Sequence, residues 1–246
     1  MVKPASANPR VLVVMPALNE EAAIADTIAE VREALPTADL LVIDDGSTDA
    51  TSAAARAAGA WVARLPYNLG VGGAMRTGYR YARSSGYDVV VQVDADGQHD
   101  PAEVGSLLAA LEDADIVIGA RFTDGDAYKV RGPRRWAMRL LARSISAIVR
   151  QRLTDTTSGF RAANRRAITL FADHYPAEYL GDTVESLVIA ARSGLKIVQL
   201  PVQMRQRRAG APSQNAARAT LYLLRAALAL VLALIRRPPP VAERVA

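Results

Sequence analysis

Short apolar runs alternate with longer amphipathic stretches along the first half of the chain. In residues 20–35, for example, Ile24, Ile28 and Val31 recur at the three- and four-residue spacing of one helical face. Strands that alternate with helices favour βαβ units, so we expect an α/β fold with a mainly parallel sheet. The predicted strands are residues 11–15 (ended by Pro16), 39–44, 61–65, 89–93, 115–119 and 196–202. The predicted helices are residues 20–35, 49–58, 71–84 and 101–111.

Polar, glycine-bearing loops follow four of the predicted strands. In open α/β sheets, ligands bind outside the carboxyl ends of the strands. The pattern therefore predicts a binding site built from residues 16–20, 44–49, 68–73 and 94–100.

The second half of the chain has a different pattern. Residues 134–152 predict a cationic amphipathic helix, in which Arg135, Arg139 and Arg143 recur every four residues. Such a helix is typical of a membrane interface, and a surface helix packed on its own sheet is the alternative.

Residues 216–235 are almost wholly apolar, but Arg225 would be costly near the middle of a bilayer. We expect this segment to lie at the interface or to dock on a membrane partner, with a buried core helix as the alternative. The expected organisation is a leader (1–10), a catalytic domain (11–213, including the helix at 133–152) and an apolar, proline-rich tail (214–246).

Composition narrows the possible chemistry. The 246 residues include no cysteine, which excludes disulfides, thiolate metal sites and a cysteine nucleophile. Only His99 and His174 are present, so a multi-histidine zinc site is not expected. The first residues lack the charged, apolar and cleavage regions of a signal peptide, so we expect a cytoplasmic N-terminus.

Charge divides the chain into two halves. Residues 1–120 contain 8 Lys and Arg against 17 Asp and Glu, whereas residues 121–246 contain 22 against 8. Basic surfaces attract nucleic acids, anionic lipid head groups or phosphorylated ligands, and charge alone does not choose among them.

Asp94 and Asp96 follow a buried strand and place two carboxylates beside one loop. Mg²⁺ and similar hard cations are commonly held by one or two carboxylates together with substrate phosphates. The pair therefore indicates a metal site suited to a nucleotide diphosphate. The alternative is a turn with solvated acids, in which Asp100 caps a helix that starts at Pro101.

Several motifs occur together and in order along the chain: Pro16-Ala17-Leu18-Asn19-Glu20-Glu21, Asp44-Asp45-Gly46-Ser47-Thr48-Asp49, Asn68-Leu69-Gly70-Val71-Gly72-Gly73-Ala74 and Asp94-Ala95-Asp96-Gly97-Gln98. Their spacing resembles the inverting family-two glycosyltransferases with the GT-A fold. Gly119-Ala120-Arg121 and Asp155-Thr156-Thr157-Ser158-Gly159-Phe160-Arg161 resemble that family's polyprenyl-phosphate branch, which includes dolichol-phosphate mannose synthases. The resemblance covers roughly residues 11–215. It implies a GT-A fold, a Rossmann-like mainly parallel sheet, followed here by C-terminal amphipathic and apolar helices.

The resemblance implies a nucleotide site and a metal site. Mg²⁺ or Mn²⁺ would be held by Asp94, Asp96 and Gln98, while His99 is expected to support the loop. Residues implied in nucleotide binding are Pro16, Ala17, Asn19, Glu20, Asp44, Asp45, Gly72, Asp94, Ala95, Asp96, Gln98 and Arg207.

Some of these side chains have structural alternatives. Asp44 can cap the turn after it, and Ser47, Thr48 and Asp49 are good turn and cap residues. The glycines at 70, 72 and 73 can serve either ligand approach or packing of the helix on the sheet. Arg207 lies in a loop that resembles the branch's late Arg-x-x-Gly loop but lacks the lysine that often follows.

In the polyprenyl branch the acceptor is a phosphate monoester, which is already anionic near neutral pH and needs no general base. The implied phosphate ligands are Arg121, Arg135, Arg139 and Arg161, and Arg121 is also expected among the catalytic residues. The alternative is a surface ion pair for Arg121 and a solvated or lipid-facing side chain for the other three. Relatives that act on hydroxyl acceptors use a carboxylate base instead, and Asp182 or Glu185 stands where that base would be.

The sequence thus predicts transfer of a sugar from a nucleotide diphosphate (UDP or GDP, with UDP preferred) to polyprenyl phosphate at the cytoplasmic face of a membrane. The expected partners include the membrane surface, a small integral-membrane subunit and further copies of the chain. Transfer to a hydroxyl of a glycolipid or glycan is the first alternative. A non-catalytic nucleic-acid-binding protein is a weaker one, because aromatic residues make up only 5% and no nucleic-acid-binding motif is present.

Overall fold

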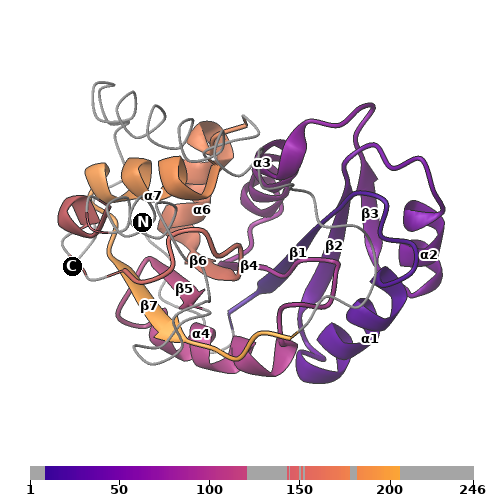
Figure 1. The fold of residues 1–246 in the computed structure, drawn as a ribbon, viewed down its shortest axis with the longest axis horizontal. Helices are drawn as coiled ribbons and strands as arrows, with labels where there is room; N and C mark the ends of the chain where they lie inside the picture. Colours follow the sequence, from indigo (N-terminus) through magenta and orange to yellow (C-terminus); the bar gives the residue numbers. More distant parts are fainter. Residues whose placement is uncertain are drawn as a thin grey trace, which may run out of the picture.

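A computed structural model describes residues 9–120, 143, 145–149, 151, 153–177 and 182–205. Their strands form one seven-stranded sheet in the order β3-β2-β1-β4-β6-β5-β7, with helices packed against it (Figure 1). The strands are β1 (Val11–Ala17), β2 (Asp39–Asp44), β3 (Trp61–Arg64), β4 (Val89–Gln92), β5 (Ile116–Ala120), β6 (Arg161–Asn164) and β7 (Ile197–Pro201). The helices are α1 (Ile24–Ala34), α2 (Thr51–Ala57), α3 (Gly70–Ser84), α4 (Val104–Ala110, preceded by the 3₁₀ turn Pro101–Glu103), α6 (Arg165–His174) and α7 (Asp182–Arg192).

Most neighbouring strands run parallel, as the alternating pattern predicted. β3, β2, β1 and β4 form a parallel block, and β7 is parallel to β5. β6 is the exception, because it inserts antiparallel between β4 and β5. The sequence did not reveal β6, since its four residues, Arg-Ala-Ala-Asn, have neither apolar alternation nor β-branched side chains.

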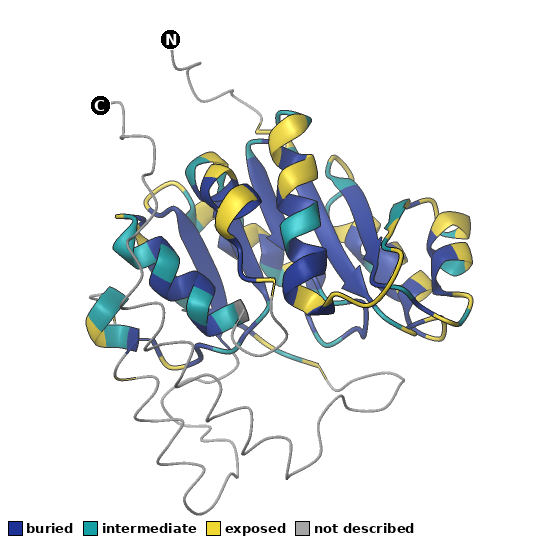
Figure 2. Cartoon of the chain, turned by 90° about the horizontal axis from the view of Figure 1, so that it is seen from above, coloured by how far each residue is buried: buried dark blue, intermediate teal, exposed yellow. Residues whose placement is uncertain are grey.

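Alternate residues of the strands supply two separate cores. One face of the sheet packs with α1, α2 and α4, and Val13, Met15 and Val91 point into it. The other face packs with α3, α6 and α7, and Leu12 and Val14 point into that core. Figure 2 shows the resulting buried strands beneath helices that are exposed on their outer side.

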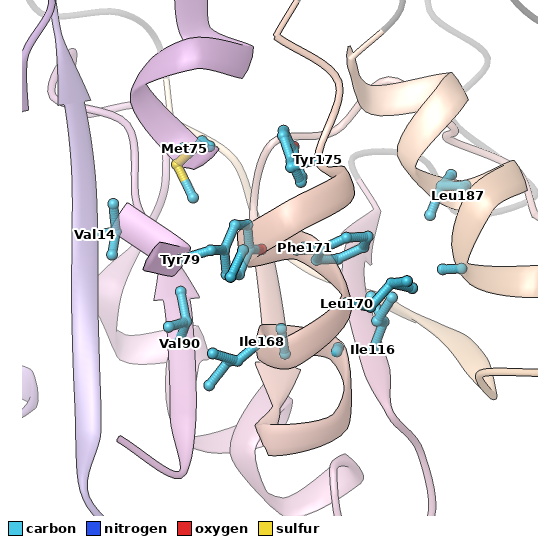
Figure 3. Close-up of a cluster of buried hydrophobic side chains, with 14 of the residues drawn as sticks. Val14, Met75, Tyr79, Val90, Ile116, Ile168, Leu170, Phe171, Tyr175 and Leu187 are labelled. Atoms are coloured by element: carbon cyan, nitrogen blue, oxygen red, sulfur yellow. The ribbon is translucent and has the colours of Figure 1, made fainter. Parts of the chain in front are cut away.

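The core beneath α3 and α6 is centred on aromatic side chains. Tyr79 lies 5.1 Å from Phe171 and 5.3 Å from Tyr175, measured between ring centroids, and all three are at least 98% buried (Figure 3). Burial raises the pKa of Tyr79 far above its ordinary value, and the nearby charge of Arg161 only partly offsets the effect. This cluster packs α3, in the first half of the chain, against α6 in the second half.

The strand order contains a topological switch point between β1 and β4. The chain runs from β1 through β2 to β3 on one side, and then returns to place β4 on the other side of β1. The loops that leave β1 and β4 therefore diverge at the carboxyl edge of the sheet, which is where ligands bind in this type of fold.

One predicted strand end needs correction, and two helices were missed. Pro16 does not end β1, which continues to Ala17. β4 pairs with β1 only as far as Val14, so the ladder on that side has ended before the missing N–H of Pro16. The helices α6 and α7 were not predicted.

The predicted amphipathic helix at 133–152 is described only in part, at Arg143 and residues 145–149, which are helical. Ile145 is fully buried in the core, and Ile148 and Val149 pack against it. For these described residues, the alternative of a helix packed on the protein's own domain is correct. Arg135, Arg139 and the tail at 214–246 lie outside the described residues. Among the helices that the structure describes, none is long and apolar enough to cross a bilayer.

Candidate active site

Three polar loops meet at the carboxyl edge of the sheet, on both sides of the switch point. They follow β1, β2 and β4 and comprise residues 18–21, 45–50 and 93–100. Pro16 and Ala17 are buried at the start of the first loop, and the carbonyl of Ala17 accepts the N–H of Asp45 at 2.9 Å. The sheet thus brings the motifs that follow β1, β2 and β4 to one edge.

The loops after β1 and β2 are joined residue by residue. The N–H of Asn19 donates to the hydroxyl of Ser47 at 2.9 Å, and its side-chain oxygen accepts the N–H of Thr48 at 2.9 Å. The N–H of Glu20 donates to the hydroxyl of Thr51 at 2.9 Å, and Glu20 itself is buried. Asn19 has a φ of 55°, a left-handed conformation that asparagine tolerates better than most residues. Ser47 and Thr48 therefore act as turn residues that hold the loops after β1 and β2 together by hydrogen bonds.

Asp44 is fully buried at the end of β2 and serves the turn that follows. It accepts the N–H of Ser47 at 2.8 Å and the hydroxyl of Ser52. Burial alone raises the pKa of a carboxyl, but these bonds and the charge of Arg64 outweigh it, so the pKa of Asp44 lies below its ordinary value. The observed contacts of Asp44 are therefore those of a residue that caps the following turn.

Asp45 joins the second loop to the first turn of α3. Its two carboxylate oxygens accept the N–H groups of Leu69 and Gly70 at 2.7 and 2.8 Å. Burial raises the pKa of Asp45 and the neighbouring charge of Asp44 adds to it, while the two N–H bonds oppose the rise. Each carboxylate oxygen has a second lone pair, so Asp45 can still accept a hydrogen bond from a ligand.

The glycines at positions 70, 72 and 73 lie in the first turn of α3. Gly70 has a φ of +80°, and a Cβ on Gly73 would lie 2.5 Å from the Cβ of Leu69. Gly72 is buried as well. The Gly73 contact lies within the first turn of α3 itself, so ligand approach and packing of the helix on the sheet both stay predictions for these glycines.

Asp94 lies at the centre of the third loop with its carboxylate held from two sides. Its Oδ1 accepts the side-chain N–H of Gln92 at 3.1 Å, and its Oδ2 lies 3.5 Å from Nε2 of His99. The N–H of Asp94 donates to Nδ1 of His99 at 2.9 Å. The Asp94 side chain remains 36% exposed. It is therefore fixed in place and still partly exposed to solvent.

The remainder of this loop is more buried. Asp96 accepts the N–H of Gln98 at 2.9 Å, and the carbonyl of Ala95 accepts the hydroxyl of Thr27 on α1 at 3.2 Å. Gln98 is half-buried, and its carbonyl accepts the N–H of Arg205 at 2.9 Å. His99 is 4% exposed and bonds to Asp94, in agreement with the supporting role expected for it.

A second segment, residues 153–161, runs against the Asp94 loop. A Cβ on Gly159 would lie 2.7 Å from Nε2 of Gln92 and 3.4 Å from both carboxylate oxygens of Asp94. The ring of Phe160 stacks on His99 with centroids 4.8 Å apart. The segment therefore packs directly against Gln92, Asp94 and His99.

Arg161 was expected to bind the acceptor phosphate, but its position does not favour that role. It is 2% exposed, and its guanidinium donates to the carbonyl of Ser158 (2.8 Å), the hydroxyl of Ser186 (2.9 Å) and the carbonyl of Thr183 (3.2 Å). The Arg161 guanidinium thus links the 153–161 segment to the first turns of α7 by hydrogen bonds.

The chain after β7 also returns to the third loop. Arg205 forms ion pairs with Asp100 at 2.8 Å and Glu30 at 2.7 Å, and Met204 pairs with His99 in an isolated bridge. Asp100 caps the following 3₁₀ turn through the N–H of Ala102, which is the contact expected from the turn alternative for this loop.

The residues present fit a divalent hard cation. In the part of the chain that the structure describes, no group of three or more acidic or histidine side chains surrounds a common point. Asp94 and Asp96 can supply two carboxylates from one loop, and Mg²⁺ or Mn²⁺ takes its other ligands from water and substrate phosphates. A thiolate metal site is excluded because the chain contains no cysteine.

Several expected site residues lie outside the described residues: Arg121, Arg135, Arg139, Arg207 and the side chain of Asp182. Glu185 is described and is half-buried on α7, one residue before Ser186, which bonds to Arg161. The geometry thus connects α7 to the Asp94 loop through Arg161 and the 153–161 segment.

Comparison with known sequences decides the family. Residues 12–171 match the family described as "Glycosyl transferase family 2", which is more than half of the chain. The chain belongs to this family. It is therefore a glycosyltransferase, and the expected GT-A fold is confirmed.

Two curated members of family 2 are similar over most of their length. An undecaprenyl-phosphate mannosyltransferase of Micrococcus luteus is 36% identical over 214 residues, which cover 82% of this chain and 86% of the relative. A polyprenol monophosphomannose synthase of Mycolicibacterium smegmatis is 30% identical, covering 84% of this chain and 82% of its own.

Among solved structures, a glucosyl-3-phosphoglycerate synthase from Mycobacterium tuberculosis is 27% identical with a TM-score of 0.70. The similarity covers 93% of this glycosyltransferase and 81% of that chain, which was crystallised with Mn²⁺, UDP-glucose and phosphoglyceric acid.

Sequence reasoning missed several residues that shape this glycosyltransferase site. Gln92 had a usable signal, because it is a polar side chain within an otherwise apolar, buried strand. Gly159 and Phe160 were part of a quoted motif but had no assigned role. Arg205 and Thr27 gave no signal, since their contacts join segments far apart in the sequence.

Proposed function

We propose that this family 2 glycosyltransferase transfers a sugar, with inversion, from a nucleotide diphosphate sugar to polyprenyl phosphate. The observation that carries the proposal is the Asp94–Asp96 loop at the switch point, in a chain whose curated relatives are named for undecaprenyl or polyprenol phosphate. The product would be a polyprenyl-phosphate monosaccharide.

The donor would bind beside the loops after β1, β2 and β4. Asn19 and Glu20 hold the first loop in place, and Asp45, which contacts the first turn of α3, would offer a remaining lone pair on each oxygen to hydroxyls of the nucleoside. The diphosphate would lie beside Asp94 and Asp96 in the loop after β4. Fixing these groups before the donor binds reduces the entropy lost on binding.

The residues of the Asp94 loop would hold Mg²⁺ or Mn²⁺ through Asp94 and Asp96, with Gln98 close by. When bound, the cation would neutralise negative charge that develops on the leaving nucleotide diphosphate. The carboxylates would supply the binding energy and the orientation, and Asp94 is kept in one orientation by Gln92 and His99.

The acceptor phosphate oxygen would attack the anomeric carbon from the face opposite the leaving group. The C–O bond to the nucleotide diphosphate breaks as the new one forms, and the configuration inverts. Because the phosphate monoester is largely ionised above its second pKa of about 6, no side chain has to remove a proton. The main requirement on the protein is to position two anionic partners, which suits the basic second half of the chain.

A polyprenyl chain lies in the bilayer, so the glycosyltransferase has to meet its acceptor at a membrane surface. We assign that surface to the cytoplasmic side, where nucleotide sugars are made. Arg121, Arg135 and Arg139 remain candidates for the acceptor phosphate, and Arg161 is removed from that group because of its burial and its three contacts.

A hydroxyl acceptor is the second candidate, because the similar solved enzyme was crystallised with phosphoglyceric acid. In that case Asp182 or Glu185 would act as general base, a contribution of about 10²- to 10⁴-fold. Asp182→Asn and Glu185→Gln together separate the two acceptors: both variants retain activity with a phosphate acceptor, and one of them loses it with a hydroxyl acceptor.

The test is an assay of the full chain with membranes, polyprenyl phosphate and a panel of radiolabelled UDP and GDP sugars. The expected result is label in the organic phase that is released by mild acid, as for a sugar phosphodiester. Acid-stable label, or no lipid-linked label with any donor in the panel, would contradict the proposal.

A further inference from the structure

The carboxylate of Asp94 lies against residues that come from three separate parts of the fold. Gln92 belongs to β4, His99 to the loop after it, and Gly159 to the segment before β6. Gln92 is 3% exposed and His99 is 4% exposed, so neither is a ligand-facing surface group. Both carboxylate oxygens of Asp94 face one of these two side chains.

His99 contacts Asp94 with both of its ring nitrogens. Nδ1 accepts the N–H of Asp94 at 2.9 Å, so the neutral ring carries its proton on Nε2. Nε2 lies 3.5 Å from Oδ2 of Asp94. The stacking of Phe160, with an interplanar angle of 20°, fixes the plane of the ring. The imidazole therefore fixes both the backbone and the carboxylate of Asp94.

Gln92 holds the other oxygen, and Gly159 leaves room for it to do so. The amide of Gln92 donates to Oδ1 of Asp94 at 3.1 Å. A Cβ on Gly159 would lie 2.7 Å from the amide nitrogen, which is closer than side-chain atoms normally approach. Only glycine at position 159 allows the Gln92–Asp94 hydrogen bond at this geometry.

We propose that Gln92 and His99 are positioning residues that fix the Asp94 carboxylate for the cation and diphosphate, and that Gly159 is required for the Gln92 contact. Each carboxylate oxygen has two lone pairs, so one on each oxygen remains for the ligand. This inference rests on the proposed function. It adds two side chains and one glycine that do not touch the substrate but set the affinity for the metal–nucleotide complex.

The test measures Mn²⁺ binding directly, by electron paramagnetic resonance of free Mn²⁺, in the full chain with UDP and separately with GDP. Calorimetry measures nucleotide binding with and without Mn²⁺, and a thermal melt checks folding. The variants are Gln92→Met, which keeps the shape and removes the donor, and Gly159→Ala. Gly105→Ala is the matched control, because a Cβ there meets nothing within 4 Å.

Gln92→Met and Gly159→Ala are expected to weaken Mn²⁺ binding in the presence of nucleotide by about 10-fold or more, as loss of such supporting contacts typically does. Metal-free nucleotide binding and the melting temperature should remain close to those of the wild type. Gly105→Ala should bind as the wild type does. Unchanged Mn²⁺ affinity in both variants would overturn the proposal, as would equal weakening of metal-free and Mn²⁺-dependent binding.

Two substitutions at His99 separate the roles of its nitrogens. His99→Gln provides a donor amide near the position of Nε2, whereas His99→Asn keeps an acceptor near Nδ1 and lacks that donor. The proposal expects weaker Mn²⁺ binding in His99→Asn than in His99→Gln, and the opposite order would overturn the role of Nε2. If the wild type bound neither nucleotide with Mn²⁺, the proposed function itself would fail, which is distinguishable from variants that bind normally.

Discussion

At the scale of single residues, the adjacent acids Asp44 and Asp45 have pKa values that are shifted in opposite directions. Asp44 and Asp45 are both buried, yet the pKa of Asp44 is lowered and that of Asp45 is raised. The difference comes from their partners: Asp44 has two hydroxyl contacts and a nearby arginine, whereas Asp45 has two backbone N–H contacts and the charge of Asp44. The sequence predicted the Asp-Asp pair but not this division, because the partners come from α2, β3 and α3.

Asp94 and Asp96 give the first prediction at this scale. Asn at either position keeps the size of the side chain and removes the negative charge that a divalent cation requires. Turnover should fall by about 10³-fold or more, since the cation is worth several kcal/mol of charge stabilisation. Steady-state assays across a Mn²⁺ titration check this, with EDTA-treated wild type as the reference. Full activity of Asp96→Asn, or of wild type in EDTA, would disprove a metal-bridged donor.

At the scale of elements, two buried polar side chains join parts of the fold that the periodicity of the sequence could not connect. Arg161 joins β6 to α7, and Asp115 joins the start of β5 to Arg166 of α6. Apolar periodicity predicted most strands and helices of the first half to within a few residues. It failed for β6, α6 and α7, whose positions depend on contacts with distant segments.

Replacement of Arg161 by Met tests the hydrogen bonds through which Arg161 links β6 to α7. Three hydrogen bonds from a charged donor are lost and their buried acceptors remain, so the free energy of unfolding should fall by about 2–4 kcal/mol. Arg165→Met is the control, because Arg165 has a side chain that is 56% exposed and one ion pair with Asp88, worth about 1 kcal/mol or less. Urea denaturation measures both. If Arg161→Met kept its stability and only raised the KM for the acceptor, Arg161 would be a phosphate ligand after all.

Asp115 predicts how stability depends on pH. Burial raises its pKa, but bonds from Lys196 N–H, Asn164 and Arg166 outweigh burial, so the folded-state pKa lies below the ordinary value of 3.8. Its contribution is therefore complete above about pH 4 and is lost as the pH falls through the lower folded-state value.

The variant Asp115→Asn should be less stable by about 3 kcal/mol at pH 7, because Arg166 loses its buried partner. The difference from wild type should shrink as the pH falls below 4. Asp113→Asn, at an exposed position two residues earlier, is the control and should match wild type. Urea melts between pH 3 and pH 7 give the comparison, and a difference that stays constant with pH would refute the linkage.

At the scale of the whole molecule, the fold class and the location of the site follow from the order of strands and loops. Alternating elements predicted a mainly parallel sheet. Polar loops at the strand ends predicted the edge of the sheet at which both Asp45 and Asp94 lie. Sequence reasoning missed the reasons for their positions, such as the packing of Gly159 on Gln92, because these depend on contacts between segments more than 60 residues apart.

The apolar segment after residue 213 gives a prediction at this scale. A chain truncated after Ser213 should still bind nucleotide with Mn²⁺, because the loops after β1, β2 and β4 all precede the cut. It should no longer sediment with liposomes, since about 20 apolar residues have been removed. Calorimetry and liposome sedimentation test the two statements separately. Loss of nucleotide binding together with loss of folding would show that the segment belongs to the core.

The central claim is that the acceptor is a lipid phosphate, and one competition measures this most directly. The full chain is given one nucleotide sugar with polyprenyl phosphate and polyprenol of the same chain length, and the products are identified by mass spectrometry. The account predicts a product with the mass of polyprenyl phosphate plus one sugar, in wild type and in Glu185→Gln. A glycosylated polyprenol as the main product, lost in Glu185→Gln, would contradict it.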